Sequence, residues 1–547
     1  MKAKSVTGPL FDVGFLLLLV SLVWVPSPAA LAGAIFSHDL LFHWDHFVVG
    51  PAIAFGHGMP LGTEIYSQYG LGWPVLVDAL AGEKPLPHRT VLALSVGYAV
   101  LVHAGLYFLL RALVGWRSLA AAGVLLALVL SLFAPMLATI QIATLWTWPS
   151  LTVLRAPMEV WFFVALLAHT RRPTRATAAA AGLLAGLALF FETDTGIFLC
   201  ATGLAYAALR AVAPAFVEPG ARAALDPAPR GSLAAAVLAA TWVLVPGMVW
   251  ASHGTLFSQP ADFLAGWIGG VLNSSDRGVG AKYLATFLHE HGAYLGAAFA
   301  SLGVGLLAVG WTLARGLHGR LDPDTLLAGC IGLYAVSRCT LFVWRTVPVR
   351  LTLVAIPAAI LATMALAALC RQRPGLGRIA PPLALLLTAF AVLSSPAFAR
   401  YPNLWRAPTE ASAAVLPGHA DLLAVEGPLA ALVPSIEALV RDVEERVRRG
   451  EDVAVLDPVK TLVYASTGAR PWIGDPAVFA NAWFRQDVLA LSERLARDGP
   501  RHVYVRSEEP VDRFRDSWRV LRSGLPEAYR RAEAIGRFER WERRPAR

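Results

Sequence analysis

Long apolar segments recur through the first 400 residues and predict the architecture of most of the chain. Eleven of them approach or reach the roughly 17–25 residues that an α-helix needs to cross a bilayer. They lie at 13–34, 91–110, 118–135, 151–169, 177–192, 196–213, 232–252, 290–312, 325–344, 351–370 and 379–397. The pattern therefore predicts a mainly α protein built on a polytopic transmembrane helix bundle of about eleven spans.

A different pattern begins near residue 400, where short apolar runs alternate with amphipathic helices. A helix at Val433–Arg449 precedes an apolar strand at Val453–Leu456, and a second helix at Gln486–Arg497 precedes a strand at His502–Val505. The alternating residues of Ala534–Trp541 predict one further strand at the edge of a sheet. This part of the sequence therefore predicts a small α/β domain.

Charged residues divide the chain at the same place. The first 399 residues carry 39 charged side chains, and the last 148 residues carry 46. We therefore assign 1–398 to a membrane domain and 399–547 to a soluble domain. This asymmetry excludes a single soluble globule and a disordered chain. No stripe of basic residues interleaved with aromatic residues is present, so nucleic-acid binding is not expected.

The placement of the basic residues predicts the orientation of the chain in the membrane. If the N-terminus is cytoplasmic, 15 of the 23 basic residues of the membrane domain fall in cytoplasmic segments, as the positive-inside rule requires. An odd number of spans then places the C-terminal domain outside. We predict a multi-pass protein of the bacterial inner membrane with a periplasmic domain in the cell envelope. A cleavable signal peptide at the start is an alternative that leaves the remaining topology unchanged.

The first outer loop, 35–90, contains a dense group of polar residues. In a helix, Asp39, His43 and His46 would share one face, and Asp45 would lie on another. A carboxylate at the membrane surface can accept the proton of an attacking hydroxyl, so Asp39 and Asp45 are candidate catalytic bases. The alternative is a solvated helix at the interface. The two histidines and Asp39 could also bind a divalent ion, but no further ligand is identifiable, and we predict no metal and no other cofactor.

Other polar residues lie where the predicted spans reach the outer side. Arg155 lies near the start of one span, and Glu192 and Asp194 lie at the end of another. Arg155 could pair with Glu159 four residues later, and the two acids could form only a tight polar turn. Tyr69 belongs to a Tyr-Gly turn that could shape an opening for a lipid or a sugar, or be an ordinary loop.

Three arginines suggest a phosphate ligand. Arg338 lies inside the span 325–344, and Arg345 and Arg350 follow it on the outer side. A guanidinium group is always charged and can bind two oxygens of a phosphate. The alternative for Arg338 is a structural ion pair with one of the two acids that end the span 177–192. Acids and arginines on the outer side together predict a phosphorylated lipid as substrate, with its head group at the outer surface.

The whole layout resembles that of the GT-C superfamily of polytopic glycosyltransferases, which includes the protein O-mannosyltransferases and the aminoarabinose transferases that modify lipid A. The acidic motif of the first outer loop, Arg155 within Leu154–Pro157, the span Gly182–Leu189 that leads to acids, and the external α/β domain carry this resemblance. The segment from Gly50 to Gly70 also looks like one that recurs in unassigned membrane proteins of this kind.

The resemblance implies an enzyme that moves a sugar from a polyprenyl-phosphate carrier to a lipid, glycan or protein acceptor, with inversion and with an Asp as general base. Superfamily members often carry Asp-Glu or Asp-Asp in this loop, whereas here Asp39 precedes Leu40 and Asp45 precedes His46, so the identity of the base stays open. The expected substrate-binding residues are His43, His46, Tyr69, Arg155, Glu192, Asp194, Arg338, Arg345 and Arg350. The rival functions are a transporter or flippase of lipid-linked saccharides and a non-catalytic assembly protein.

Overall fold

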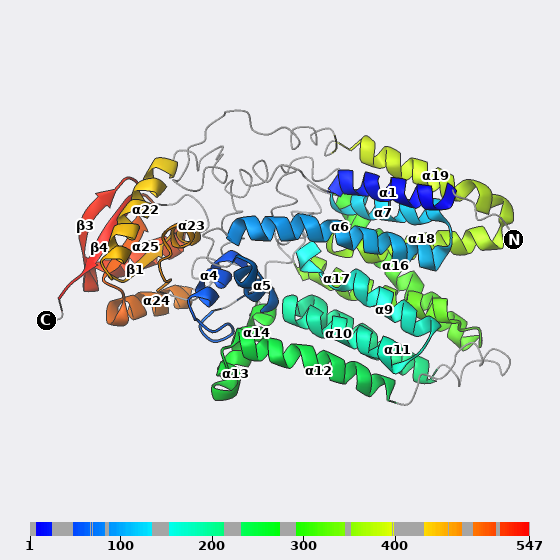
Figure 1. Ribbon diagram of the computed structural model, residues 1–547, viewed down its shortest axis with the longest axis horizontal. Helices are drawn as coiled ribbons and strands as arrows, with labels where there is room; N and C mark the ends of the chain where they lie inside the picture. The colour runs from blue at the N-terminus through cyan, green and yellow to red at the C-terminus, as the bar shows by residue number, and fades with distance from the viewer. Residues whose placement is uncertain are drawn as a thin grey trace.

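The computed structural model of the chain describes residues 7–23, 48–65, 67, 69–81, 87–133, 153–212, 231–273, 292–344, 352–395, 398, 432–457, 459–472, 485–509 and 515–545. The molecule is elongated, with long helices that run side by side along its longest axis (Figure 1). A small domain that contains the only sheet of the described residues lies at one end. The N-terminal helix begins at the opposite end of the bundle.

Each of the eleven predicted spans overlaps a helix of the bundle, although part of the span 13–34 lies outside the described residues. These helices are α1 (Thr7–Val23), α6 (Pro87–Val114), α7 (Arg117–Ser131), α9 (Glu159–Arg171), α10 (Arg175–Phe191), α11 (Thr193–Val212), α12 (Ser232–Ala251), α16 (Gly292–Leu317), α17 (Pro323–Trp344), α18 (Thr352–Gln372) and α19 (Pro374–Leu393). Within the described residues, six helices are long and apolar enough to cross a membrane by length and composition. The mainly α architecture is confirmed, while the number and orientation of the spans stay predictions.

Small residues bring two of these helices into close contact. A Cβ atom at Gly182 of α10 would overlap the carbonyl oxygen of Ala236 on α12, and one at Gly186 would lie 2.6 Å from that of Ala240. Real Cβ atoms do not approach backbone oxygens so closely, so only glycine permits this spacing. Such close approach is typical of helix pairs in membranes, where packing rather than the hydrophobic effect drives association.

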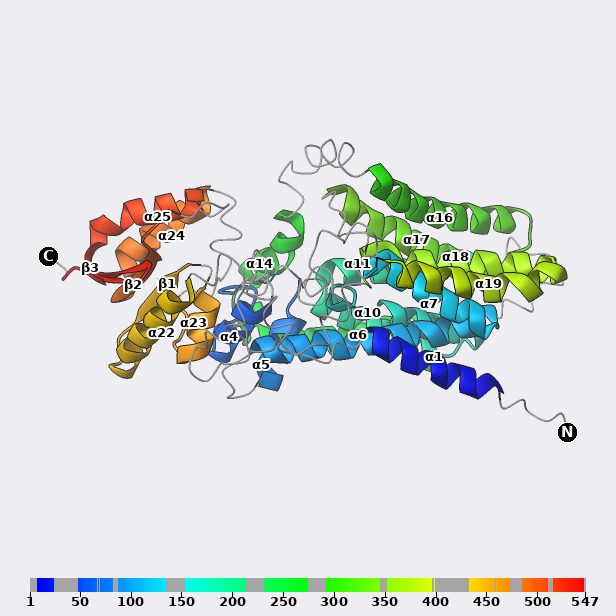
Figure 2. The same ribbon diagram turned by 90° about the horizontal axis from the view of Figure 1, so that it is seen from above.

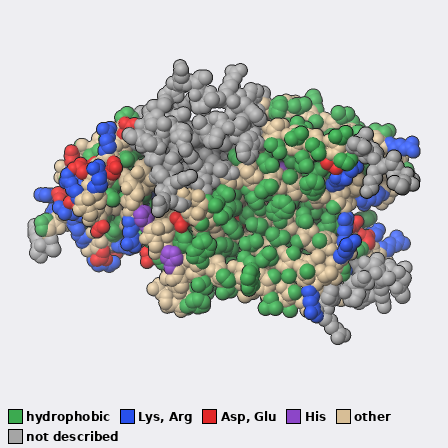
Figure 3. All heavy atoms as spheres, viewed as in Figure 1, with side chains coloured by type: hydrophobic (Ala, Val, Ile, Leu, Met, Phe, Trp, Pro, Cys, Tyr) green, Lys and Arg blue, Asp and Glu red, His purple; other side chains and the backbone are tan. Residues whose placement is uncertain are grey.

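Basic residues gather at the end of the bundle that lies away from the C-terminal domain, as Figure 3 shows. Arg117 and Arg111 both bind Asp12 of α1, with Arg117 Nε 3.1 Å from the carboxylate. Arg371 and Arg171 donate hydrogen bonds to carbonyl oxygens in the last turn of α6. Cations stabilise the C-terminal end of a helix because its last carbonyl groups have no partner within the helix.

Short helices lie between the bundle and the C-terminal domain (Figure 1). They are α4 (Gly50–Gly56), α5 (Gly72–Ala81), η4 (Val153–Arg155), α13 (Thr255–Ser258) and α14 (Pro260–Asn273). Helix α5 contains an apolar stretch that is too short to cross a bilayer. The predicted span 151–169 begins later than expected, since the α-helical part starts only at Glu159.

The C-terminal domain contains a four-stranded sheet. Its elements are α22 (Val433–Arg448), β1 (Val453–Leu456), α23 (Lys460–Thr467), α24 (Arg485–Asp498), β2 (His502–Arg506), α25 (Arg515–Ala528), β3 (Tyr529–Ile535) and β4 (Phe538–Arg543). The strand order is β1-β2-β4-β3, with β1 parallel to β2 and the other pairs antiparallel. The two predicted helix-strand pairs are confirmed. The single edge strand predicted at Ala534–Trp541 is wrong, because Gly536, with φ of +56°, turns the chain there into a β3–β4 hairpin.

Alternation along the strands divides the core of this domain into two layers. Val453, Val455 and Tyr504 pack with the layer of α22 and α23, while Ala454 and Leu456 pack with that of α24 and α25. Figure 2 shows the two helix pairs on opposite sides of the sheet. Strands covered on both faces read as continuous apolar runs, which explains why β1 was recognisable in the sequence.

Replacing Gly182 with alanine tests the close packing of α10 on α12. We expect a destabilisation of about 1–3 kcal/mol because the new methyl group forces the helices apart. The measurement is the thermal melting of the purified protein in detergent. Gly310→Ala is the matched control, since no atom lies within 4 Å of a Cβ at Gly310 on α16, and it should melt at or above the wild-type temperature. Equal melting of both variants would contradict the packing described here.

Candidate functional site

Arg155 is the centre of a buried ion cluster at the end of the bundle that faces the C-terminal domain. Its side chain is only 9% exposed. One nitrogen donates to Glu192, and Nη2 lies 2.7 Å from Asp194 Oδ2. The guanidinium group also lies over the ring of Tyr69, 4.3 Å from its centroid. Both carboxylates and the aromatic face therefore stabilise one cation in a place with little water.

The two acids reach Arg155 because the chain turns very tightly between α10 and α11. Helix α10 ends at Phe191, Glu192 is extended, and α11 begins at Thr193. Gly196 makes this turn possible, because a Cβ there would overlap the backbone of Leu189. The tight polar turn suggested by the sequence is therefore present, and its acids also belong to the ion cluster.

Arg338 of α17 joins the same cluster from the other side. Its side chain is completely buried. Nη1 donates to Thr195 Oγ1 at 2.5 Å and lies 3.8 Å from Asp194 Oδ1, and Nε donates to the carbonyl oxygen of Leu353 at 3.4 Å. The Thr195 hydroxyl in turn donates to the backbone carbonyl of Arg155 at 2.8 Å. The ion pair with Asp194 is the structural alternative considered for Arg338 in the sequence.

Glu159 does not pair with Arg155, which corrects the pairing considered from the sequence. Arg155 belongs to the 3₁₀ turn η4, and α9 begins only at Glu159, so the two residues do not follow α-helical spacing. Glu159 is buried and interacts electrostatically with Arg338 and Tyr334 instead. The cluster thus contains two guanidinium groups and three carboxyl groups.

The ion cluster fastens a segment inside the loop 35–90 to the bundle. Thr193 N donates to the carbonyl oxygen of Tyr69, and Leu71 N donates to that of Phe190, both at 2.9 Å. Gly70, with φ of +143°, lies so close to the Phe190 and Phe191 carbonyl groups that a side chain would collide with them. Main-chain bonds and the Tyr69 ring therefore hold this loop directly above Arg155.

A second outer segment covers the same place. Trp267 of α14 donates through Nε1 to Thr193 Oγ1 at 3.1 Å. The ring of Phe263 fills the space beside Gly62, whose φ of +89° suits only glycine. Leu61 N donates to the carbonyl oxygen of Ala251 at 2.9 Å. Parts of the chain that are about 200 residues apart in the sequence are thus packed around the ion cluster.

The predicted substrate-binding residues divide into two groups. The structure brings together Tyr69, Arg155, Glu192, Asp194 and Arg338. The other predicted site residues lie outside the described residues: Asp39, His43, Asp45, His46, Arg345 and Arg350.

Sequence reasoning missed Glu159, Thr195 and Tyr334 as members of the cluster. An ionisable residue inside an apolar span indicates a candidate site by itself. By that rule Glu159 could have been included among the predicted site residues. Within the described ranges, no group of three or more His, Cys, Asp or Glu residues could hold a metal ion.

Comparison with known proteins finds similarity among solved structures. No protein-family profile matches the chain, and no curated protein matches its sequence. A solved structure with a similar arrangement is the crystal structure of ArnT from Cupriavidus metallidurans bound to undecaprenyl phosphate. The match has a TM-score of 0.49 and a sequence identity of 14%, and it covers 96% of this chain and 98% of that chain.

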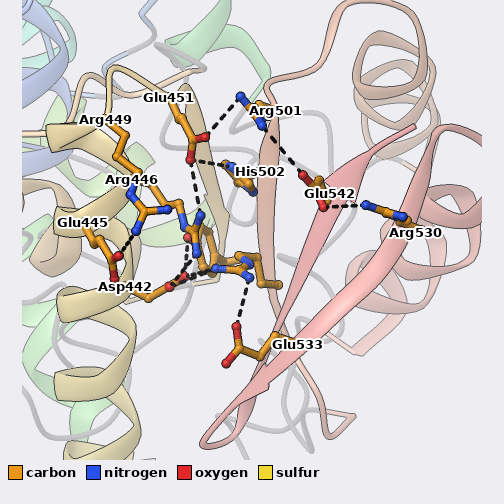
Figure 4. Close-up of polar contacts among 12 residues, drawn as sticks. Asp442, Glu445, Arg446, Arg449, Glu451, Arg501, His502, Arg530, Glu533 and Glu542 are labelled. Atoms are coloured by element: carbon orange, nitrogen blue, oxygen red, sulfur yellow. Dashed lines mark hydrogen bonds and ion pairs between the residues drawn. The ribbon is translucent and has the colours of Figure 1, made fainter. Parts of the chain in front are cut away.

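A second group of charged residues lies in the C-terminal domain, between α22 and the sheet (Figure 4). Asp442 accepts from Tyr504 Oη at 2.7 Å and from Arg540 Nη1 at 3.0 Å. Glu451 accepts from His502 Nε2 at 2.9 Å and lies 3.1 Å from Arg501 Nη1. These contacts connect α22 and the loop after it to β2 and β4, so the network stabilises the domain.

Removing the central cation should unfold the outer end of the bundle. Arg155→Gln leaves two buried carboxylates with one guanidinium group, and breaking a buried pair in this way costs about 3–5 kcal/mol. We expect a large fall in melting temperature and in the yield of folded protein, measured by size-exclusion chromatography in detergent. Arg111→Gln is the control, because the Arg111 side chain is 31% exposed and water can replace it. A loss no greater than that of the control would contradict the central role of Arg155.

The stability of the C-terminal domain should fall in acid. Burial lowers the pKa of His502 below its ordinary 6.5, although Glu451 opposes the shift. Burial tends to raise the pKa of Glu451, but the hydrogen bond and charge of His502 and the charge of Arg501 lower it overall. Both groups release protons more easily in the folded state, so the unfolded chain binds more protons below about pH 6.5.

We therefore expect the melting temperature of the full-length protein to fall between pH 7.5 and pH 5, with a smaller fall for His502→Gln. Thermal melting at a series of pH values measures this slope. His318→Gln is the control, because His318 is exposed at the far end of the bundle and its replacement should leave the slope unchanged. If the melting temperature of His502→Gln changes with pH as steeply as that of the wild type, other groups cause the acid sensitivity.

Proposed function

We propose that the protein is a membrane glycosyltransferase that moves a sugar from a polyprenyl-phosphate donor to an acceptor on the outer side of the membrane. The observation that carries this proposal is the buried ion cluster of Arg155, Glu192, Asp194 and Arg338. It fixes a segment of the first outer loop, in which the sequence places the candidate bases Asp39 and Asp45. A reaction at the head group of a lipid needs its polar groups at this level of the bilayer.

The position of the buried charges favours a transferase over a transporter. Among the described residues of the bundle, the buried charged side chains at the outer end are Arg155, Glu159, Glu192, Asp194 and Arg338, and those toward the other end are Asp12 and Arg210. A transporter is expected to line a path at the bilayer midplane, often with interrupted helices. The buried charges of this bundle instead gather mainly at the end that faces the C-terminal domain, which supports a reaction at that end.

The ion cluster acts as a positioning device in this proposal. Arg155 is engaged by two carboxylates, and Arg338 by Asp194 and Thr195. These contacts support a structural role for both arginines, so binding of the lipid phosphate falls to Arg345 and Arg350, which follow α17 in the sequence. Tyr69 holds the loop through its contact with Arg155.

The proposed reaction follows from the chemistry of the predicted residues. Asp39 or Asp45 takes the proton from an acceptor hydroxyl, whose oxygen attacks the anomeric carbon of the sugar. The bond from that carbon to the phosphate oxygen breaks, and the polyprenyl phosphate leaves with the electron pair. Positive side chains stabilise the charge that develops on the phosphate. Attack on the face opposite to the leaving group inverts the anomeric configuration.

The substitutions Asp39→Asn and Asp45→Asn test the proposed base. General base catalysis typically contributes about 10²–10⁴-fold to a rate, so one of the two should lower sugar transfer by this factor while the protein folds normally. The assay follows the release of polyprenyl phosphate and the labelling of membrane acceptors from a radiolabelled polyprenyl-phosphate sugar. Asp262→Asn on the exposed surface of α14 is the matched control. Full activity of both variants would eliminate the base.

Proteoliposomes distinguish the transferase from a flippase. A flippase moves a lipid-linked saccharide between leaflets and leaves its phosphate bond intact, whereas the proposed enzyme breaks that bond. We expect polyprenyl phosphate to accumulate when donor and acceptor are present on the outer side. Translocation without cleavage would overturn the proposed function.

A further inference from the structure

Arginines collect at the far end of the bundle, away from the C-terminal domain, where five packed helices meet. These helices are α1, α6, α7, α18 and α19 (Figure 1). The short turns between them carry most of the charge, with arginines on both the α6–α7 turn and the α18–α19 turn: Arg111, Arg117, Arg371, Arg373 and Arg378. Asp12 is the one acid in the sequences of the five helices. This end therefore has a clear excess of positive charge.

The excess charge belongs to the α18–α19 turn. The two arginines of the α6–α7 turn bind Asp12. Arg371 donates through Nη2 to carbonyl oxygens at the end of α6 at 3.0 and 3.3 Å, and its guanidinium group lies 5.9 Å from the ring centroid of Trp116. These contacts fasten the α18–α19 turn to the α6–α7 turn. Arg373 and Arg378 are exposed beside them, and the five helices contain no second acid to neutralise them.

Helix α19 continues from these two arginines as an exposed apolar surface. Leu386 follows Arg378 by eight residues and therefore lies on the same face of the helix. Ile379, Leu387 and Phe390 extend this face, and the four apolar side chains are between 59% and 69% exposed. A fixed pair of cations thus borders directly on a surface that acyl chains would cover in a bilayer.

The other turns at the far end lack this combination. In the α16–α17 turn, Arg315 lies 2.8 Å from Asp322, and Asp324 adds a second negative charge. The α9–α10 turn carries the exposed Arg172 and Arg175, but the helix that follows it is covered by α12. Only the α18–α19 turn, among the described turns at this end, joins uncompensated arginines to an open apolar helix.

We propose that the α18–α19 turn binds an anionic phospholipid, with the phosphate at Arg373 and Arg378 and an acyl chain along α19. A guanidinium group can bind two oxygens of a phosphate. The positive-inside rule predicts that this end is cytoplasmic, and the cytoplasmic leaflet is the one that attracts basic residues through its anionic lipids. The site lies at the opposite end of the bundle from the ion cluster, so it is independent of the proposed sugar transfer.

Native mass spectrometry of the full-length protein tests the proposal. The protein in neutral detergent is mixed with equal amounts of phosphatidylglycerol and phosphatidylcholine that have identical acyl chains. A basic residue near a membrane surface contributes about fivefold to the affinity for anionic lipid, so two arginines should give a preference for phosphatidylglycerol of at least about tenfold. Equal retention of the two lipids by the wild type would overturn the proposal.

The double substitution of Arg373→Gln with Arg378→Gln locates the site. It should remove most of the preference for phosphatidylglycerol and leave the retention of phosphatidylcholine unchanged. The matched control is Arg441→Gln with Arg448→Gln, because these arginines are 74% and 72% exposed on α22 of the C-terminal domain, and it should keep the wild-type preference. An unchanged preference in the first pair, or an equal loss in both pairs, would contradict the assignment to this turn.

Thermal melting in nanodiscs separates a lipid site from a site for free anions. In phosphatidylcholine alone, both double variants should melt with the wild type, because all four side chains are exposed. Adding phosphatidylglycerol should raise the melting temperature of the wild type and of the control pair, but not that of Arg373→Gln with Arg378→Gln. Millimolar inorganic phosphate in phosphatidylcholine should have no such effect. Stabilisation by phosphate equal to that by phosphatidylglycerol would show a free-anion site and overturn the proposal.

Discussion

The outer end of the bundle depends on one constraint: charges buried among apolar helices must be paired. Moving an isolated ion into a medium of low dielectric constant is very costly, and only close opposite charges and hydrogen bonds offset that cost. Arg155 therefore fixes Glu192 and Asp194, and Asp194 in turn neutralises Arg338. These residues come from η4, the α10–α11 turn and α17, so the pairing requirement determines how three parts of the bundle meet.

The two ends of the bundle use charge in different ways. Asp12, Arg111 and Arg117 form a cluster at the far end, but both arginine side chains are about one-third exposed. Water can replace a lost partner there, so this end tolerates change. At the outer end, main-chain hydrogen bonds from Thr193 and Leu71 tie the first outer loop to the same residues that complete the ion cluster. A catalytic group must be held in a fixed position, and a loop tied to a rigid cluster of buried ion pairs meets that requirement.

The sequence allowed most of the helices to be predicted because crossing a bilayer imposes a minimum apolar length that is visible in a single chain. The same reasoning found β1 and β2, since strands covered on both faces are apolar throughout. It failed at the β3–β4 hairpin, where alternation continues across Gly536 and hides the turn. It also failed at Glu159, because sequence patterns relate residues that are close along the chain, such as Arg155 and Glu159. The partners that matter here, such as Arg338 and Thr195, are 143 residues apart.

The composition of the ion cluster constrains the proposed chemistry. Arg155 is already engaged by Glu192 and Asp194, and Arg338 by Asp194 and Thr195, within the ion cluster. We therefore assign the binding of phosphate in the proposed reaction to Arg345 and Arg350, which follow α17 in the sequence. The four arginines considered for the site thus fall into two groups. In the proposed reaction, the arginines of the ion cluster stabilise the fold and hold the loop, and the arginines that follow α17 bind the substrate.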